Sequence, residues 1–301
     1  MNVVITGASG FVGKFLTKKL STEANKVICL GRSEESLDQI PMYSNVETHV
    51  TDYSISDLEA AMSGYDTLIH LAGRRLTHSD DPLRVSPFTN ATMETLDNLL
   101  AAAAKNDFKR VVNTSSIGAY SAFNEAPYSE LDIALPATPY GLTKLFTEQA
   151  IDFWSRKTGI SAAHVRLTQC YGYGEKWTPV LMRFIKNAIN GENLTVNDSG
   201  FSLDQIYIKD TVSAFVLLAQ SEKKGRFNIG SGESLTLLEM AETVKKVFNT
   251  TIAIDLARDN PSPGQHLRHM NILKAKNELN WCPQYDLEKG LHHMKKIMDS
   301  Q

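Results

Sequence analysis

The sequence predicts an α/β protein: a Rossmann-type doubly wound parallel sheet with a smaller C-terminal substrate lobe. Short β-branched runs alternate with helical patterns through the first half of the chain, which is the order of βαβ units. The expected strands are apolar throughout, as strands are when helices cover both faces of a sheet. A glycine-rich turn follows the first of them, at the place where this fold binds its ligand.

We expect the following elements in order. The strands cover residues 3–5, 27–30, 46–51, 67–71, 110–114 and 162–167, and the helices between them cover 11–20, 58–62, 93–104 and 140–154. After Thr168 glycine-containing loops become frequent, with helices at 180–190, 210–219, 237–248 and 272–279. We therefore assign residues 1–168 to an NAD(P)-binding Rossmann domain and residues 169–301 to a substrate-binding lobe. Residues 204–222, with a strand at 205–208, are expected to rejoin the large sheet.

Composition excludes several classes of function. The 301 residues carry a net charge of −3, so no basic surface for nucleic acid is expected. No apolar run is long enough to cross a membrane, and no signal peptide is expected at the start. Cys29, Cys170 and Cys282 are far apart and have no metal-ligand spacing, which predicts a reducing, cytoplasmic location and no metal.

The glycine-rich turn contains Gly7, Gly10 and Gly13, between a strand and a helix. The first glycine permits a tight turn, the second lets the backbone approach a pyrophosphate, and the third lets helix and strand pack closely. The helix N-terminus then favours the negative charge of the pyrophosphate. An ordinary strand–helix turn is the alternative, but this context predicts an NAD(P) site that also includes Ser9, Phe11 and Val12.

The end of the second strand bears on the choice of cofactor. An acidic residue here would bind the adenosine ribose of NAD, but this chain has Gly31 followed by Arg32. A small residue followed by an arginine leaves room and charge for the 2′-phosphate of NADP. NAD and NADP both stay open, with NADP favoured, because Arg32 is equally compatible with an exposed loop arginine.

Further cofactor contacts are expected at the ends of the next two strands. Asp52 and Tyr53 follow the third strand, beside the expected adenine site. Leu71, Ala72 and Gly73 end the fourth strand, and the small residues among them allow close approach of a ligand. His70 lies in the same apolar strand and is interpreted as a core histidine.

Tyr140 and Lys144 lie four residues apart at the start of a predicted helix, and therefore on one face. A nearby ammonium favours the phenolate form, which makes the tyrosine a usable general acid or base. Ser116 ends another strand at the ligand-binding edge of the sheet, where its hydroxyl can reach the same substrate oxygen. These three residues form the predicted catalytic set, and Tyr140 and Lys144 are also expected to contact the cofactor.

Taken together, these motifs resemble the extended short-chain dehydrogenases/reductases, and within them the NAD-dependent epimerase/dehydratase family that acts on nucleotide sugars. The resemblance covers nearly the whole chain, including Arg166-x-x-x-x-Tyr171-Gly172 and the ending Trp281-x-Pro283. It implies that Tyr140 exchanges a proton with the sugar, that Lys144 holds the nicotinamide ribose, and that Ser116 assists. It also implies a nucleoside-diphosphate sugar as substrate and a homodimer.

Departures from the family pattern narrow the expected reaction. Ser116-Ile117-Gly118 stands where the 4,6-dehydratases carry Thr-Asp-Glu, which argues against dehydration. Gln169 replaces a substrate-contacting Asn, Leu203 replaces an Arg that grips the diphosphate, and Thr92 stands where the family has an Asn. Another diphosphate-binding motif is replaced by residues 262–265. Substitute cations are Arg74, Arg75, Lys176, Arg183 and Arg268. Further substrate-lobe positions that are either pocket or core are Trp177, Val180, Leu181, Thr195 and Val196.

The leading hypothesis is a nucleotide-sugar 4-epimerase, similar to those acting on UDP-glucose or UDP-N-acetylglucosamine. An NADPH-dependent 4-ketoreductase needs the same residues and is favoured by Arg32. A dinucleotide-binding protein without enzymatic activity is the alternative from another class, although it predicts a broken catalytic set.

Overall fold

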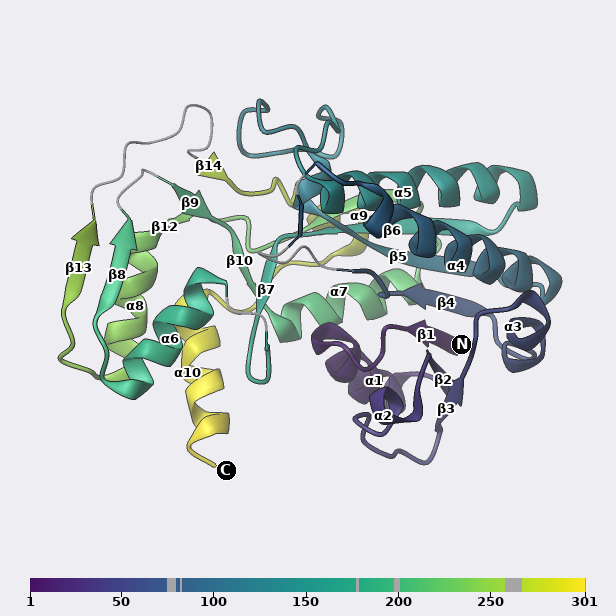
Figure 1. Cartoon of the computed structure of the whole chain (residues 1–301), viewed down its shortest axis with the longest axis horizontal. Coiled ribbons are helices and arrows are strands. Elements are labelled where there is room, and N and C mark those ends of the chain that lie inside the picture. Colours follow the sequence, from purple (N-terminus) through teal and green to yellow (C-terminus); the bar gives the residue numbers. More distant parts are fainter. Residues whose placement is uncertain (75–79, 82, 177–178, 198–200, 258–266, 301) are drawn as a thin grey trace. The chain divides into compact units, whose positions relative to one another are not determined.

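The computed structural model describes residues 1–74, 80–81, 83–176, 179–197, 201–257 and 267–300 (Figure 1). The chain forms two compact units. Unit 1 comprises Met1–Ser121, Ile133–Arg166 and Val212–Phe227, and unit 2 comprises Ala122–Asp132, Leu167–Thr211 and Asn228–Gln301.

Unit 1 is built on a seven-stranded sheet with the order β11-β6-β5-β4-β1-β2-β3. Its strands are β1 (Asn2–Thr6), β2 (Lys26–Gly31), β3 (Val46–Val50), β4 (Thr67–His70), β5 (Arg110–Ser116), β6 (Ser161–Leu167) and β11 (Gly225–Ile229). Neighbouring strands from β3 to β5 pair in parallel. The chain order reverses between β1 and β4, and ligands of doubly wound sheets bind at such a reversal. The predicted fold class is confirmed.

The helices of unit 1 cover both faces of this sheet (Figure 1). They are α1 (Phe11–Glu23), α2 (Glu34–Leu37), α3 (Ile55–Ala61), α4 (Ser86–Lys105), the 3₁₀ turn η1 (Ile117–Ala119), α5 (Pro139–Thr158) and most of α7 (Ile208–Gln220). Helices α4 and α5 pack side by side over one face, and α1 and α7 lie over the other. Helix α4 begins seven residues before the predicted 93–104, with Pro87 in its first turn, where proline is tolerated.

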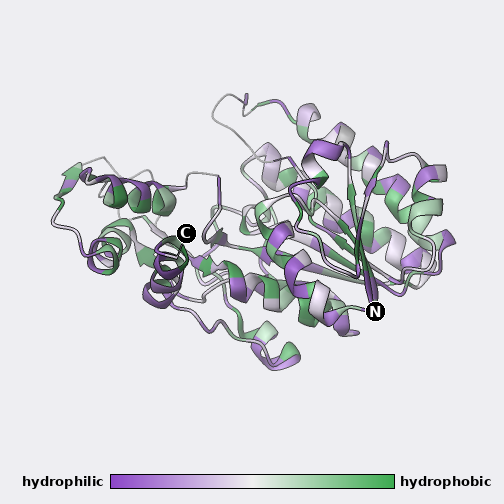
Figure 2. Ribbon diagram, turned by 90° about the horizontal axis from the view of Figure 1, so that it is seen from below, coloured by the Kyte–Doolittle hydropathy of each residue, from purple (hydrophilic) through white to green (hydrophobic). Residues whose placement is uncertain are grey.

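The core of unit 1 explains why these segments fold together. Strands β1, β2, β4 and β5 present almost fully buried aliphatic residues, and the helices turn one apolar stripe toward the sheet (Figure 2). In α4 this stripe is formed by Leu96, Leu99, Leu100 and Ala103, all at most 3% exposed. Burying such a side chain contributes about 1.5–3 kcal/mol. Among the described residues, no helix has the length and apolar character needed to cross a membrane.

Unit 2 contains three small sheets and four helices among its described residues. The sheets are β10 (Gln205–Tyr207) with β7 (Gln169–Tyr171), β8 (Leu194–Asn197) with β13 (Ile254–Ala257), and β9 (Ser202–Leu203) between β12 (Leu235–Thr236) and β14 (Leu267–Arg268). The helices are α6 (Val180–Asn190), α8 (Leu237–Phe248), α9 (Leu273–Leu279) and α10 (Leu287–Met298). Asp204 holds the loops of this unit together, because its buried carboxylate accepts hydrogen bonds from Ser231, Gly232 and Met270.

One expectation about the large sheet needs correction. The strand predicted at 205–208 forms as β10, but it pairs with β7 rather than with the large sheet. The strand that completes the large sheet is β11, beside β6. Both strands are short and mix polar with apolar residues, and their partners are distant in sequence, so local pattern does not distinguish them. The helix after β10 does cluster with unit 1 from Val212 onward.

Candidate active site

The glycine-rich turn forms a tight cradle at the carboxyl end of β1. Gly7 has a φ of +74°, which favours glycine, and a Cβ there would lie 2.7 Å from the backbone nitrogen of Ala72. A Cβ on Gly13 would lie 2.3 Å from the carbonyl oxygen of Gly7. Gly10 is the N-cap of α1. These contacts fit the requirement for a backbone that approaches a dinucleotide closely.

A cavity of about 360 Å³ lies against this cradle, entirely within unit 1. The residues around it are Gly7, Ser9, Leu30, Gly31, Arg32, Ser36, Tyr53, His70, Ala72, Gly73, Arg74, Pro87, Thr92 and Thr95. They include six of the cofactor residues predicted from the sequence and Thr92, at the position where the resemblance leads us to expect an Asn. Ser36 and Thr95 were not predicted from the sequence, because no motif marks them.

Other predicted cofactor residues lie beside the cavity rather than in its wall. Asp52 is exposed, and its carboxylate accepts a hydrogen bond from the backbone of Ser54 at 2.7 Å. Phe11 and Val12 form the first turn of α1 and are half-buried, and the Phe11 ring packs edge-on against Phe15. Leu71 donates its backbone N–H to the carbonyl of Thr6, which continues the pairing of β4 with β1.

His70 lines the cavity with one ring nitrogen unsatisfied. Its side chain is 3% exposed, and Nδ1 lies 2.8 Å from Oγ1 of Thr6. Within the described part of the chain, Nε2 has no hydrogen-bond partner. Burial, together with the nearby charge of Lys144, lowers the pKa of His70 to about 3, so the ring is neutral at physiological pH. It is a core histidine, as interpreted from the sequence, but only one of its two ring nitrogens has a hydrogen-bond partner among the described residues.

Ser116 and Tyr140 are brought together by two glycines. In the first turn of α5, a Cβ on Gly141 would lie 2.1 Å from the carbonyl oxygen of Gly118 in η1. A Cβ on Gly118 would lie 3.5 Å from Oγ of Ser116 and 3.9 Å from Cδ1 of Tyr140. Gly141 was not predicted to be important. Glycine inside a helix costs about 1 kcal/mol, so its presence there was a signal of a close contact.

Lys144 lies one helical turn beyond Tyr140 and is almost fully buried. Its Nζ lies 5.8 Å from the centre of the Tyr140 ring and donates a hydrogen bond to the carbonyl of Thr114 at 2.9 Å. The same Nζ would be 3.0 Å from a Cβ on Gly73, a residue of the cavity wall. The ammonium group therefore lies between the predicted acid–base residue and the cavity.

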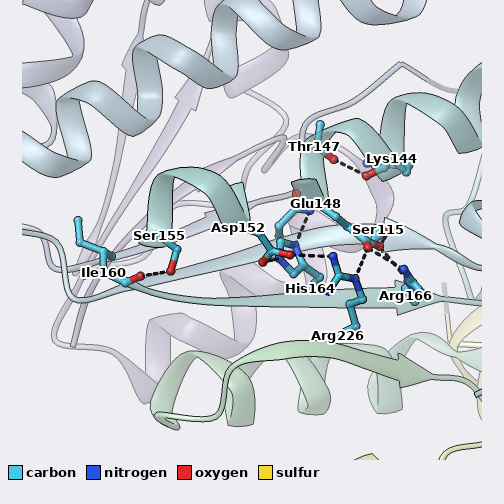
Figure 3. A network of polar contacts seen from close by, with 11 residues as sticks. Ser115, Lys144, Thr147, Glu148, Asp152, Ser155, Ile160, His164, Arg166 and Arg226 are labelled. Atoms are coloured by element: carbon cyan, nitrogen blue, oxygen red, sulfur yellow. Dashed lines mark hydrogen bonds and ion pairs between the residues drawn. The ribbon is translucent and has the colours of Figure 1, made fainter. Parts of the chain in front are cut away.

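A buried ionic network continues along the same helix (Figure 3). Glu148 is fully buried and accepts hydrogen bonds from Ser115, Arg166 and Arg226. Burial alone would raise the pKa of Glu148, but the hydrogen bonds and charge of Arg166 lower it below its ordinary value. Asp152 pairs with Arg226 at 2.7 Å and faces His164 at 2.9 Å. No sequence motif predicted this network.

In unit 2, the structure brings two of the predicted substrate-side residues together. Arg183 and Thr195, with Phe184 and Asn187, line a cavity of about 300 Å³ between α6 and β8. Val196 is 1% exposed because β8 turns alternate side chains inward, so it belongs to the core. The amide of Gln169 accepts a hydrogen bond from Gln205.

The remaining predicted substrate-side residues are dispersed. Trp177, Arg75 and residues 262–265 lie outside the described residues. Arg74 is paired with Asp80 and stacks on Phe88, and Lys176 is exposed. In α6, Leu181 is fully buried and Val180 is half-buried. This agrees with the alternative that these two residues belong to the core. Leu203 is also buried, and the backbone of Arg268 pairs with it between β14 and β9.

The fold and the cavity together define a class of protein. A doubly wound sheet, a glycine cradle at its reversal point and a serine, tyrosine and lysine beside the cradle are the parts of a nicotinamide-dinucleotide enzyme.

The particular family follows from comparison with known proteins. The sequence profile of the family described as "NAD dependent epimerase/dehydratase family" matches residues 3–230, and the chain belongs to that family. The chain is 27% identical to the dTDP-4-dehydro-6-deoxyglucose reductase of Escherichia coli, with 98% of this chain and 96% of that protein covered. It is 24% identical to the UDP-glucose 4-epimerase of Halalkalibacterium halodurans, with 97% and 94% covered.

A solved structure agrees with these relatives. The UDP-N-acetylglucosamine 4-epimerase from Bacillus cereus superposes with a TM-score of 0.86 at 29% sequence identity, covering 100% of this chain and 97% of that one. The resemblance stated from the motifs is therefore confirmed, and so is the prediction of an enzyme that depends on a nicotinamide dinucleotide. The hypothesis of a non-enzymatic protein is set aside.

Proposed function

We propose that this enzyme interconverts nucleoside-diphosphate sugars by epimerisation at C4, with Tyr140 as the acid–base residue. The observation that carries the proposal is the convergence of Ser116, Tyr140 and Lys144 beside the cavity at the end of β1 and β4. Homodimerisation and a cytoplasmic location, expected from the sequence, belong to the same proposal.

Each residue has a role that its contacts support. A bound nicotinamide supplies reversible hydride transfer at a sugar carbon. Tyr140 accepts the proton of the sugar hydroxyl on oxidation and returns it on reduction. Lys144, anchored by Thr114, keeps a positive charge beside the phenol and favours its ionised form. Ser116 holds the sugar oxygen, since its Oγ accepts a hydrogen bond from the backbone of Gly118 and its proton can point to substrate.

The surroundings of Ser116 argue against a dehydratase. Elimination of water needs an additional acid and base near the reacting carbons. The residues after Ser116 are Ile117 and Gly118, and a side chain at Gly118 would lie directly between Ser116 and Tyr140. The chain therefore has no carboxylate at the place where the family's dehydratases carry one.

A 4-ketoreductase is the second candidate. Arg32 in the cavity wall favours it, because NADPH is the usual donor for net reduction, and the relative from Escherichia coli is named as a reductase. Both reactions use the same acid–base residue, so the site residues alone do not separate them.

One assay distinguishes the two. The purified enzyme is incubated with UDP-glucose or UDP-N-acetylglucosamine without added NADPH, and the sugars are separated by chromatography. We expect the C4 epimer to accumulate to equilibrium. Oxidation of NADPH only in the presence of a 4-keto sugar nucleotide would refute the epimerase and support the reductase.

The role of Tyr140 is tested in the same assay. Tyr140→Phe should lower turnover by about 10²–10⁴-fold while leaving cofactor binding intact, because only the proton-transfer group is lost. Tyr43→Phe, in the loop before β3 and outside the cavity wall, serves as the matched control and should keep full activity. Unchanged turnover in Tyr140→Phe would overturn the mechanism.

A further inference from the structure

The 360 Å³ cavity against the glycine cradle carries positive charge and, among its described residues, no carboxylate at its end next to β2. Arg32 and Ser36 line it from the β2–α2 connection, and Thr95 lines it from α4. No aspartate or glutamate is among the described residues of the cavity wall. If the glycine cradle holds the pyrophosphate, as in other doubly wound sheets, this end would hold the adenosine half of the dinucleotide.

Gly31 stands at the position where an NAD-selecting enzyme carries a carboxylate, and the side chain of Leu37 fills the space there. That carboxylate stands at the end of the second strand and binds the ribose 2′-hydroxyl. Here a Cβ on Gly31 would lie 2.7 Å from Cδ2 of Leu37, and Leu37 is buried. An acidic side chain at this position therefore needs Leu37 to move.

Arg32 is held in position by neutral groups only. Its guanidinium donates a hydrogen bond to Oγ1 of Thr95 at 2.9 Å and lies over the Tyr53 ring, 5.3 Å from its centre. Within the described residues it makes no ion pair. Arg32 is exposed, and an arginine without a counter-charge in the wall of a ligand cavity favours an anionic ligand group.

The Tyr53 ring beneath Arg32 is positioned by an unusual backbone conformation. Tyr53 has a φ of +62°, which is uncommon for a residue other than glycine, and its side chain is 6% exposed. Its N–H donates to Oγ1 of Thr51, and its carbonyl accepts a hydrogen bond from Asn98 of α4. Strained residues held this way cluster at ligand sites, and here the strain places the ring under Arg32.

From these observations we infer that Arg32 is a seat for the 2′-phosphate of the cofactor, and that this chain selects NADP(H) over NAD(H). Arg32 supplies the charge and Ser36 a hydroxyl in the cavity wall, and Gly31 places no carboxylate there to repel a phosphate. The inference rests on the proposed function only in that a nicotinamide dinucleotide binds here, and it holds for either an epimerase or a reductase.

Binding of NADP⁺ and NAD⁺ to the full-length enzyme, measured by isothermal titration calorimetry, tests the inference. Adenosine 2′,5′-bisphosphate and 5′-AMP serve as probes of the same end of the cavity. We expect each 2′-phosphorylated ligand to bind about 10- to 100-fold more tightly than its counterpart, as charge-assisted hydrogen bonds allow. Nucleotide released from the freshly purified protein should be NADP(H) by mass.

Three variants make the test specific. Arg32→Ala should remove the preference by weakening NADP⁺ and leaving NAD⁺ unchanged, and Thr95→Val should remove part of it, because the guanidinium loses its hydrogen bond. Arg84→Ala, an exposed arginine outside the cavity wall, is the control and should change neither. Added salt should lower the affinity for NADP⁺ more than the affinity for NAD⁺.

The outcomes separate this inference from the proposed function. Equal affinity of the wild type for NADP⁺ and NAD⁺, or equal weakening of both by Arg32→Ala, overturns the 2′-phosphate seat and leaves the proposed reaction standing. Failure of either dinucleotide to bind overturns both. Normal NADP⁺ selectivity without turnover of any nucleotide sugar overturns the proposed reaction alone.

Discussion

Glu148→Gln is expected to be the most destabilising conservative substitution in α5. The carboxylate is fully buried and faces two guanidinium groups (Figure 3). Oε1 accepts from Nε of Arg166 at 2.9 Å, and Oε2 accepts from Nη2 of Arg166 at 2.8 Å and from Nε of Arg226 at 2.8 Å. An amide keeps the shape but removes the charge, and its NH₂ group must face an arginine donor.

The size of the stability loss follows from the buried charge of Arg166, which Glu148→Gln leaves without its carboxylate partner. The side chain of Arg166 is 2% exposed, and its Nη1 has no partner among the described residues, so the lost charge cannot be replaced by water. Removing one partner of a buried ion pair costs about 3–5 kcal/mol of unfolding free energy. Asp152→Asn, one turn further along α5, is a matched change at a half-buried site and should cost only about 1 kcal/mol.

Urea unfolding followed by circular dichroism measures both variants. The lowered pKa of Glu148 adds a pH signature: its stabilising contribution is present above the unfolded value of 4.5 and is lost as pH falls through the folded value. Glu148→Gln should therefore be less stable at pH 7 and have a flatter acid limb than the wild type. Equal losses for Glu148→Gln and Asp152→Asn at pH 7 would refute the reasoning.

Three further predictions concern the glycine cradle, the half-satisfied histidine and unit 2. Gly13→Ala should abolish dinucleotide binding in calorimetry and cost about 1–3 kcal/mol, because its Cβ meets the Gly7 carbonyl; normal binding would contradict the cradle. The pKa of His70 is lowered from 6.5 to about 3, so the unfolded state takes up the proton first. The contribution of His70 to the unfolding free energy is therefore fully present above pH 6.5 and falls by up to roughly 5 kcal/mol toward pH 3. His70→Gln should reduce the dependence of the urea midpoint on pH between pH 6.5 and pH 3. An unchanged dependence on pH would exclude His70 as its source. Asp204→Asn should cost about 2 kcal/mol in thermal unfolding, because an amide cannot accept from three backbone N–H groups and a hydroxyl; a smaller loss would show that the loops hold without it.

The parts of this protein that the sequence could predict are those with a local physical signature. Strand β1, the glycine turn and α1 follow one another without a gap, so periodicity and glycine spacing were sufficient for the cradle. The i, i+4 spacing placed Tyr140 and Lys144 on one face for the same reason. Helix α10 was missed although Leu287, Leu291 and Met294 show the spacing of a buried helix stripe.

Other features depend on pairs that are distant in the chain. The contact between Gly118 and Gly141 sets the distance from Ser116 to Tyr140, but 22 residues separate the two glycines, and neither has an unusual local pattern. The choice of β11 over β10 as the seventh strand has the same origin, since a short strand of mixed polar and apolar residues does not specify its partner. Conversely, Thr195 and Val196 are neighbours, and only the alternation of β8 shows which one reaches a cavity.

Helix α5 joins the stability of unit 1 to its chemistry. Tyr140, Lys144, Glu148 and Asp152 recur every four residues and therefore share one face of the helix. The first two lie beside η1 and β5, and the last two are tied by Arg226 of β11, while Arg166 of β6 also holds Glu148. An α-helix turns by about 100° per residue, so a small rotation of α5 would break this network and carry the proposed acid–base phenol away from Ser116 at the same time. The buried charges are costly to maintain, and their position on this face fixes the helix rotation on which the proposed proton transfer depends.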